Sequence, residues 1–391
     1  MDYSQKAQSN MEYMVNCRRY LHQNPELSTN LPKTIEFVTG QLSSMGIPYH
    51  VIPKGGIIGY IGKLDGNVFL LRADMDALPV QEQSGEPFSS KNGNMHACGH
   101  DIHTSMLLGA AKLLKQQEHT LEGGVKLVFQ CDEEGTSGMA TLIENGVLSD
   151  PVVSAGMALH VLPGDLYAGQ YFCASGPVSS AVDQFKITIV GKGAHGATPQ
   201  KGIDPINVAA HICLALQTII SREICASDTA LLSNGFLQAG SAFNVIPSTA
   251  VLGGTVRSFS KDVGEFIKKR IVEISEYTSK AFNATCQVEF PNSAPSCIND
   301  KDVTALVQKC GASVGLSNIN LRIPTVSEDF SLLTQHVPCC FVWIGAGGSN
   351  EIYKGGVLHD EKVCFNEAVM PLGAALFASS ATSWLAEHAA K

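Results

Sequence analysis

The segment NMHACGHDIHT, residues 94–104, combines one cysteine, three histidines and one aspartate, all of which can bind a metal ion. Three further polar elements follow apolar runs elsewhere in the chain: CDEEG at 131–135, His160 in ALHVLPG and His359 in GGVLHDE. In an open α/β sheet, ligands bind where the strands end at their carboxyl side. We therefore expect these four elements to meet at a single site.

The donor atoms of these elements favour divalent transition ions. The candidate ligands are Cys98, His100, one of Glu133 and Glu134, His160 and His359. Thiolate, imidazole and carboxylate together suit zinc, manganese, cobalt or nickel better than calcium or magnesium, which prefer oxygen ligands. One catalytic ion takes about three ligands from the protein, so this set predicts two ions per chain with an activated water between them. One glutamate would then coordinate a metal, and the other would move protons as the general base.

Two other interpretations of these motifs explain less of the sequence. Cys98 could be the nucleophile of a cysteine hydrolase with His100 as its base, but such an enzyme needs neither the glutamate pair nor the distant histidines. The segment GAGGSN, residues 345–350, is similar to a dinucleotide-binding loop, but it lacks the third glycine and the following helix. A metal site accounts for all four elements.

Apolar periodicity predicts the strands and helices that position these residues. The runs VFLLRADM, residues 68–75, and VKLVFQ, residues 125–130, have the apolar character of buried strands. Between them, TSMLLGAAKLL places one apolar stripe on a helix that begins near Thr104. A strand, a helix and a second strand in this order predict a parallel sheet covered by helices.

The following block has a different order of elements. A strand at 184–190 precedes a helix from Asp204, and the strands ALLSNGFLQ and TAVLGGTVRS come next. A helix from about Asp262 and the strand CQVEF complete the order βαββαβ, which is that of ferredoxin-like domains. This block is therefore predicted to be a separate, inserted domain.

The chain of 391 residues is too long for one ordinary core, which agrees with two domains. We predict an α/β protein whose catalytic α/β/α domain has a mostly parallel central sheet and comprises residues 1–181 and 292–391. The inserted ferredoxin-like domain, which would serve in dimerisation or as a lid, comprises residues 182–291.

Composition excludes several classes of partner. The net charge of −9 and the absence of a Lys/Arg run argue against nucleic acid and against anionic membranes. The first residues lack the pattern of a signal peptide, and we expect no membrane-spanning segment. Twelve scattered cysteines are typical of reduced, buried thiols, so we expect a cytoplasmic protein.

The quoted motifs, in their order along the chain, resemble a known family. They are RRYLHQNPELS, RADMDALP, MHACGHDIHTSMLLGAAKLL, FQCDEEG, ALHVLPG, GKGAHGATPQKGIDPI, NVIP and GGTVR. Together they are similar to the amidohydrolase branch of the aminoacylase and carboxypeptidase-type dinuclear metallohydrolases. That branch contains hippurate hydrolase, N-acyl-amino-acid deacylases, N-acetyldiaminopimelate deacetylase and plant hydrolases of indoleacetyl amino acids.

The resemblance implies a role for each residue of the metal motifs. Cys98 matches the ligand that bridges the two ions, and Glu133 matches the general base. Asp76 stands where relatives have an Asp that orients a ligand; the ligand His of that motif is replaced by Asp74, and His100 takes over its role. The remaining ligands match His100, Glu134, His160 and His359.

In the inserted domain the resemblance implies substrate contacts. His195 and Asn244 match groups that polarise the scissile carbonyl, and Arg257 matches a residue that holds the substrate carboxylate. The family also implies a homodimer, with a tetramer as the alternative, in which His195 reaches the partner's site. One departure concerns the loop of His359, which has Glu361 where relatives usually have proline.

The implied activity is hydrolysis of the amide bond of N-acyl amino acids, such as N-acetyl or N-benzoyl derivatives, with Glu133 as the general base. A dipeptidase or carboxypeptidase of the same family is the first alternative. The second is a non-catalytic protein that binds acyl amino acids. Retention of both Glu133 and Glu134 argues against a mere binder, which has no use for a spare base beside a ligand.

Overall fold

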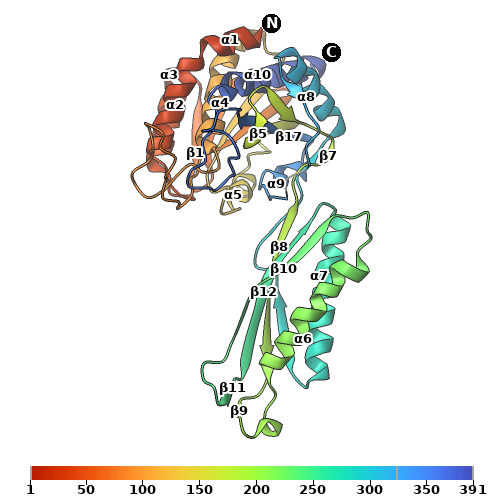
Figure 1. Cartoon of the computed structure of the whole chain (residues 1–391). Coiled ribbons are helices and arrows are strands. Elements are labelled where there is room, and N and C mark those ends of the chain that lie inside the picture. The colour runs from red at the N-terminus through yellow and green to blue at the C-terminus, as the bar shows by residue number, and fades with distance from the viewer. Residues whose placement is uncertain (1, 323–324, 390–391) are drawn as a thin grey trace. The chain divides into compact units, whose positions relative to one another are not determined.

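The computed structural model describes residues 2–322 and 325–389 and divides into two compact units (Figure 1). Unit 1 comprises Met1–Val178, Ile298–Arg322 and Asp329–Lys391, and unit 2 comprises Ser179–Cys297 and Ile323–Glu328. The main boundaries fall after residues 178 and 297. The boundaries expected from the sequence were after residues 181 and 291. The short segment that returns to unit 2 after Arg322 was not foreseen.

Unit 1 is built on an eight-stranded sheet in the order β1-β2-β4-β3-β5-β17-β6-β16. Its strands are β1 (Tyr49–Ile52), β2 (Gly56–Gly62), β3 (Val68–Asp74), β4 (Gly124–Gln130), β5 (Ala155–Tyr167), β6 (Gln170–Phe172), β16 (Ser317–Asn318) and β17 (Cys339–Gly347). The four central strands β4, β3, β5 and β17 run parallel, with Leu71 opposite both Leu127 and Met157. Every residue of β3 and β4 is buried, as expected where helices cover both faces of a parallel sheet.

The helices of unit 1 are α1 (Tyr3–Ser9), α2 (Met11–Gln23), α3 (Pro32–Ser44), α4 (His100–Lys115), α5 (Gly138–Glu144), α8 (Lys301–Ser313), α9 (Ser331–Thr334) and α10 (Val369–Glu387), with a short 3₁₀ turn at Glu118–Thr120. α4 begins at His100, four residues earlier than the predicted start near Thr104. By length and composition alone, α10 is long and apolar enough to cross a membrane. However, 78% of its apolar window is buried within the protein, which is typical of a core helix.

Unit 2 has the predicted order βαββαβ. Its elements are β8 (Ala181–Val190), α6 (Pro205–Thr218), β10 (Ala230–Ala239), β12 (Thr249–Ser258), α7 (Lys261–Ala281) and β13 (Thr285–Glu289). The strands form an antiparallel sheet in the order β10-β12-β8-β13, to which β14 (Ser293–Ala294) adds beside β8. Phe185, Ile187 and Ile189 alternate inward along β8 and form a separate core with α6 and α7. The predicted α/β fold class is confirmed.

Short two-stranded ladders complete both units. In unit 2, β9 (Ala194–His195) pairs with β11 (Val245–Ile246). In unit 1, β7 (Gly176–Pro177) pairs with β15 (Ile298–Asn299), so the chain leaves unit 1 beside the point where it returns.

Candidate metal centre

A glycine turn places Cys98 and His100 at the start of α4. Gly99 precedes the helix with φ 86°, a left-handed conformation that favours glycine. A Cβ atom at this position would lie 2.4 Å from Cγ2 of Val161, so the turn packs directly against β5. Cys98 and His100 are both buried, one on each side of Gly99.

A second turn follows β4 and carries Glu133 and Glu134. Asp132 adopts φ 56°, and its carboxylate accepts hydrogen bonds from two serine hydroxyls, one of which belongs to Ser28 (2.5 Å). Asp76, just beyond β3, accepts the backbone N–H groups of Glu133 (3.1 Å) and Glu134 (3.2 Å). Asp76 therefore orients the turn that presents both glutamates.

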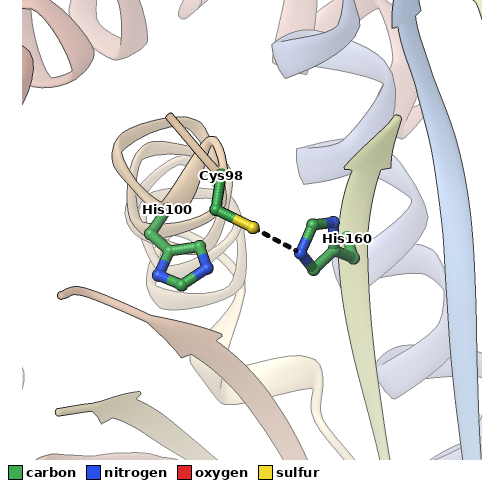
Figure 2. Close-up of side chains that lie close together, drawn as sticks. All are labelled: Cys98, His100 and His160. Carbon is green, nitrogen blue, oxygen red and sulfur yellow. Dashed lines mark hydrogen bonds between the residues drawn. The ribbon is translucent and has the colours of Figure 1, made fainter. Parts of the chain in front are cut away.

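His160 lies within β5, and the backbone of the next residue orients its ring. Nδ1 of His160 donates a hydrogen bond to the carbonyl of Val161 (2.8 Å), which leaves Nε2 without a proton in the neutral ring. Nε2 lies 3.4 Å from Sγ of Cys98, and Figure 2 shows the two side chains pointing at each other. This geometry suits metal binding through Nε2.

His359 comes from the loop after β17 and is half exposed, at 51% of its side-chain surface. The backbone of His359 adopts φ 68°, and its N–H donates to the carbonyl of Ala97 (3.0 Å). The carbonyl of Glu361 accepts a hydrogen bond from the N–H of Gln83 (2.7 Å), so this loop is held although it lacks the usual proline. Nε2 of His359 lies 3.3 Å from Oε1 of Glu134.

The structure brings together all the predicted ligands. Their candidate donor atoms fall into groups within 4.8 Å of one another: Cys98, His100 and His160; Cys98, Glu134 and His359; and His100, Glu133 and Glu134. Cys98 is common to the first two groups. Two adjacent positions that share one thiol are the arrangement expected for two ions with a bridging ligand.

Burial and nearby charges favour the protonated forms of Cys98 and His100 in the absence of a cation. Burial, and next the charge of Glu134, raise the pKa of the Cys98 thiol well above its ordinary value. Burial lowers the pKa of His100, but neighbouring carboxylates, Asp74 first, raise it to about 10. Neither ring nitrogen of His100 makes a hydrogen bond within the described residues, although Oδ1 of Asp76 is 3.5 Å from Nδ1.

These donors fit divalent transition ions. Metal binding requires the thiolate and the neutral imidazole, and a cation would favour both forms over the protonated ones. A buried imidazole without hydrogen bonds is available for a ligand, as the donor chemistry of the sequence predicts.

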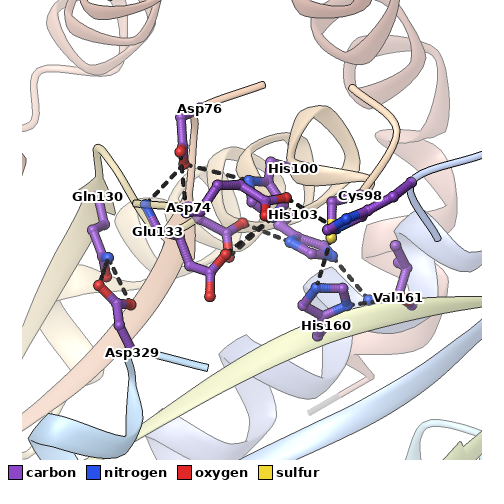
Figure 3. Close-up of polar contacts among 12 residues, drawn as sticks. Asp74, Asp76, Cys98, His100, His103, Gln130, Glu133, His160, Val161 and Asp329 are labelled. Carbon is purple, nitrogen blue, oxygen red and sulfur yellow. Dashed lines mark hydrogen bonds and ion pairs between the residues drawn. The ribbon is translucent and has the colours of Figure 1, made fainter. Parts of the chain in front are cut away.

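Buried polar residues beside the ligands form a network that Figure 3 shows in part. Arg72 in β3 donates to Gln130 (2.9 Å), Asp74 (2.8 Å) and Asp329 (3.0 Å). The sequence analysis assigned no role to Arg72, Gln130 or Asp329. A signal was present for Arg72, because an arginine inside an apolar strand needs buried partners; Asp329 lies far away along the chain and offered none.

The predicted substrate contacts all lie in unit 2. His195 and Asn244 are exposed; His195 lies in β9, and Asn244 directly precedes β11, where Val245 pairs with His195. Arg257 lies on β12 and is partly buried, and its Nη1 makes no hydrogen bond within the described residues.

A mostly parallel sheet that gathers cysteine, histidine and glutamate side chains into groups of candidate metal ligands, together with an inserted βαββαβ unit, defines a metal-dependent hydrolase. The sequence matches peptidase family M20/M25/M40 over residues 70–383. The chain belongs to this family, and it is a hydrolase that acts on amide bonds.

Relatives and solved structures agree with this assignment. The chain is 39% identical to N-acetyl-L-cysteine deacetylase of Bacillus subtilis over 89% of this chain and 84% of the relative. It is 38% identical to IAA-amino acid hydrolase ILR1-like 4 of Arabidopsis thaliana, over 96% and 86%. The structure of a dinuclear metal binding peptidase of the M20 family from Bacillus subtilis superposes with a TM-score of 0.84 at 34% identity, covering 97% of this chain and 99% of that one.

Proposed function

We propose that this enzyme removes the acyl group from N-acyl amino acids with the help of two divalent transition ions, zinc, manganese, cobalt or nickel. The proposed ligands are Cys98 as the bridge, His100, Glu134, His160 and His359. The observation that carries the proposal is the presence of Cys98 in two neighbouring groups of donors. The bound ions would polarise the scissile carbonyl and make water a good nucleophile at neutral pH.

Glu133 is the proposed general base. It belongs to the same turn as Glu134, but Glu134 is grouped with His359 and Cys98, whereas Glu133 is grouped with neither of these two residues. Its carboxylate would take a proton from the attacking water and deliver it to the nitrogen of the leaving amino acid. Asp76 supports this role, since it holds the backbone N–H groups of both glutamates.

Three residues of unit 2 have the chemistry needed to bind the acyl amino acid. The backbone N–H of Ala197 donates to Nδ1 of His195 (3.0 Å), so the neutral ring carries its proton on Nε2. That N–H could then donate to the oxyanion of the transition state, and Asn244, just before the paired strand β11, would assist it. The partly buried guanidinium of Arg257 suits the substrate carboxylate.

The relatives support an acyl amino acid as the substrate. The two named above are described as acting on N-acetyl-L-cysteine and on amino acid conjugates of IAA. A carboxypeptidase is the second candidate, because the chain is also 35% identical to thermostable carboxypeptidase 2 of Saccharolobus solfataricus over 93% of both chains. Both activities require an anchor for a free carboxylate, which Arg257 would provide.

A substrate screen on metal-loaded enzyme distinguishes these candidates. The apoenzyme is loaded in turn with Zn, Mn, Co or Ni and offered N-acetyl, N-benzoyl and indoleacetyl amino acids beside dipeptides with a free amino terminus. We expect hydrolysis of the acylated compounds and close to two ions per chain at saturation. Preference for free dipeptides would favour the carboxypeptidase, and full activity with one tightly bound ion would refute the two-metal centre.

We further propose that the active form is a dimer that assembles through unit 2. β10 is at the edge of the antiparallel sheet, and its side chains Leu231, Phe236 and Leu237 are exposed. An apolar edge strand with open hydrogen-bonding groups is a natural surface for pairing with a second copy. In this dimer His195 would serve the partner's active site.

A further inference from the structure

The side chain of His103 lies beside the proposed ligands, yet its hydrogen bonds prevent it from binding metal. A candidate donor atom of His103 lies within 4.8 Å of those of Asp74 and His100. The backbone N–H of Val161 donates to Nε2 of His103 (2.8 Å), and Nδ1 of His103 donates to Oδ1 of Asp74 (2.6 Å). Since a backbone N–H can only donate, the ring must be the Nδ1–H tautomer, and both its nitrogens are engaged.

Val161 connects His103 to the proposed ligand His160 through two backbone hydrogen bonds. Its N–H is bonded to His103, and its carbonyl accepts the hydrogen bond from Nδ1 of His160. The same residue therefore fixes the tautomer of both rings. Both nitrogens of His103 are engaged in hydrogen bonds, whereas His160 presents an unprotonated Nε2 towards Cys98 (Figure 3).

On the other side of Asp74, Arg72 holds the carboxylate in place. Nη1 of Arg72 donates to Oδ2 of Asp74 at 2.8 Å, while Oδ1 of Asp74 accepts the hydrogen bond from Nδ1 of His103. Arg72 is itself held by Asp329, which also accepts hydrogen bonds from Gln130 (2.8 and 2.7 Å). All these side chains are fully buried, so their mutual bonds replace those to water.

We propose that Arg72 and Asp329 are positioning residues for the metal centre: they orient the Asp74 carboxylate, which holds the His103 ring against the N–H of Val161 and so keeps the carbonyl of Val161 in place to orient His160 for binding through Nε2. The proposal rests on the two-metal centre proposed above. It adds that this centre depends on two side chains that are not among its proposed ligands.

The test compares the variants Arg72→Met and Arg72→Lys with wild type by chelator competition and by the visible spectrum of the cobalt-loaded protein. We expect Arg72→Met to weaken the binding of at least one ion by about 10–100-fold, the range found when partners of metal ligands are removed. Its cobalt spectrum should change, because the ligand field at His160 changes. Arg72→Lys should restore part of the affinity, since it keeps a donor towards Asp74.

Lys126→Met is the matched control. Lys126 is a buried cation in the neighbouring strand β4, and it bonds the carbonyls of Val147 (2.6 Å) and Pro151 (2.8 Å) instead of the network. Its loss should lower the stability of the protein but leave metal affinity and the cobalt spectrum unchanged. An equal loss of affinity in Lys126→Met and Arg72→Met would reduce the role of Arg72 to general stability and overturn the proposal.

If Arg72→Met does not fold, Asp329→Asn takes its place, because it keeps the shape of the side chain while weakening its bond to Arg72. A folded variant, Arg72→Met or Asp329→Asn, that binds both ions as tightly as wild type would also overturn the proposal. Nitrogen-15 NMR of histidine-labelled apoprotein gives a readout without metal: we expect the Nδ1–H tautomer at His103 in wild type and a shifted Nδ1 resonance in the variant, because its bond to Asp74 is disturbed. Failure of the wild type to bind two ions would instead refute the proposed function.

Discussion

At the scale of single residues, two adjacent glutamates would perform different tasks because one turn points them at different partners. Glu133→Gln should keep the metal content of the wild type, since Glu133 is not a proposed ligand. Its turnover should fall by roughly the 10²–10⁴ attributed to general acid–base catalysis. Metal analysis and steady-state kinetics on the same preparation measure both effects.

The neighbouring variant provides the contrast. Glu134→Gln should lose affinity for at least one ion, because this carboxylate lies 3.3 Å from His359 and in the same group as Cys98. Glu144→Gln, an exposed change at the end of α5, is the control and should resemble wild type. If Glu133→Gln lost metal and Glu134→Gln kept it, the two roles would have to be exchanged.

At the scale of elements, the turn into α4 should be intolerant of any side chain at Gly99. In Gly99→Ala the left-handed φ costs roughly 1–2 kcal/mol. The new Cβ, 2.4 Å from Val161, adds about 1–3 kcal/mol of overpacking. We expect a lower free energy of unfolding and weaker metal binding, measured by denaturant unfolding and chelator competition.

Gly46→Ala separates the two costs. Gly46 also has a left-handed φ, 65°, but a Cβ there would meet nothing within 4 Å. This variant should suffer only the conformational cost and keep its affinity for metal. Equal losses in both variants would show that close packing against β5 is unimportant.

The sequence was sufficient to predict the elements wherever local patterns determine them. The buried strands β3 and β4, the βαββαβ order and the helix that Asp204 caps all have short-range signatures, and each was found where it was expected. The start of α4 was wrong by four residues, because the left-handed Gly99 has no unambiguous signal in one sequence.

The site, like the fold, was predictable only where local sequence patterns determine it. Ligand side chains at strand ends could be listed from their chemistry, and the resemblance assigned each one a role. The bonds of Asp329 to Arg72 and Gln130 could not be predicted, since they join residues about 200 and more positions apart along the chain. Only the folded sheet brings such residues together.

At the scale of the whole molecule, subunit exchange tests whether His195 acts in the partner's site. Two variants, Glu133→Gln and His195→Ala, should each be inactive or nearly so. Loss of the histidine would remove one oxyanion donor, worth about 3–4 kcal/mol of barrier. When the two are mixed under conditions that exchange subunits, a heterodimer carries one site with both defects and one intact site, so activity should return.

Proof of exchange makes a negative result informative. Subunits of different mass, followed by native mass spectrometry, show when heterodimers have formed. Mixtures that stay inactive after exchange would place His195 in its own chain's site or deny it the role. A protein that remains monomeric at catalytic concentrations would refute the dimer altogether.

The ladder between β7 and β15 has a consequence for the engineering of this chain. Pro177 pairs with Ile298, so the two ends of the insertion are already hydrogen-bonded neighbours, and joining them closes only a short loop. A gene in which a brief glycine linker replaces codons 179–297 should therefore yield a truncated protein that still loads two ions, because all proposed ligands lie in unit 1. Without His195 and Arg257 it should be a metal carrier and not a hydrolase, and metal analysis beside an amide assay would show whether binding and turnover are separable modules.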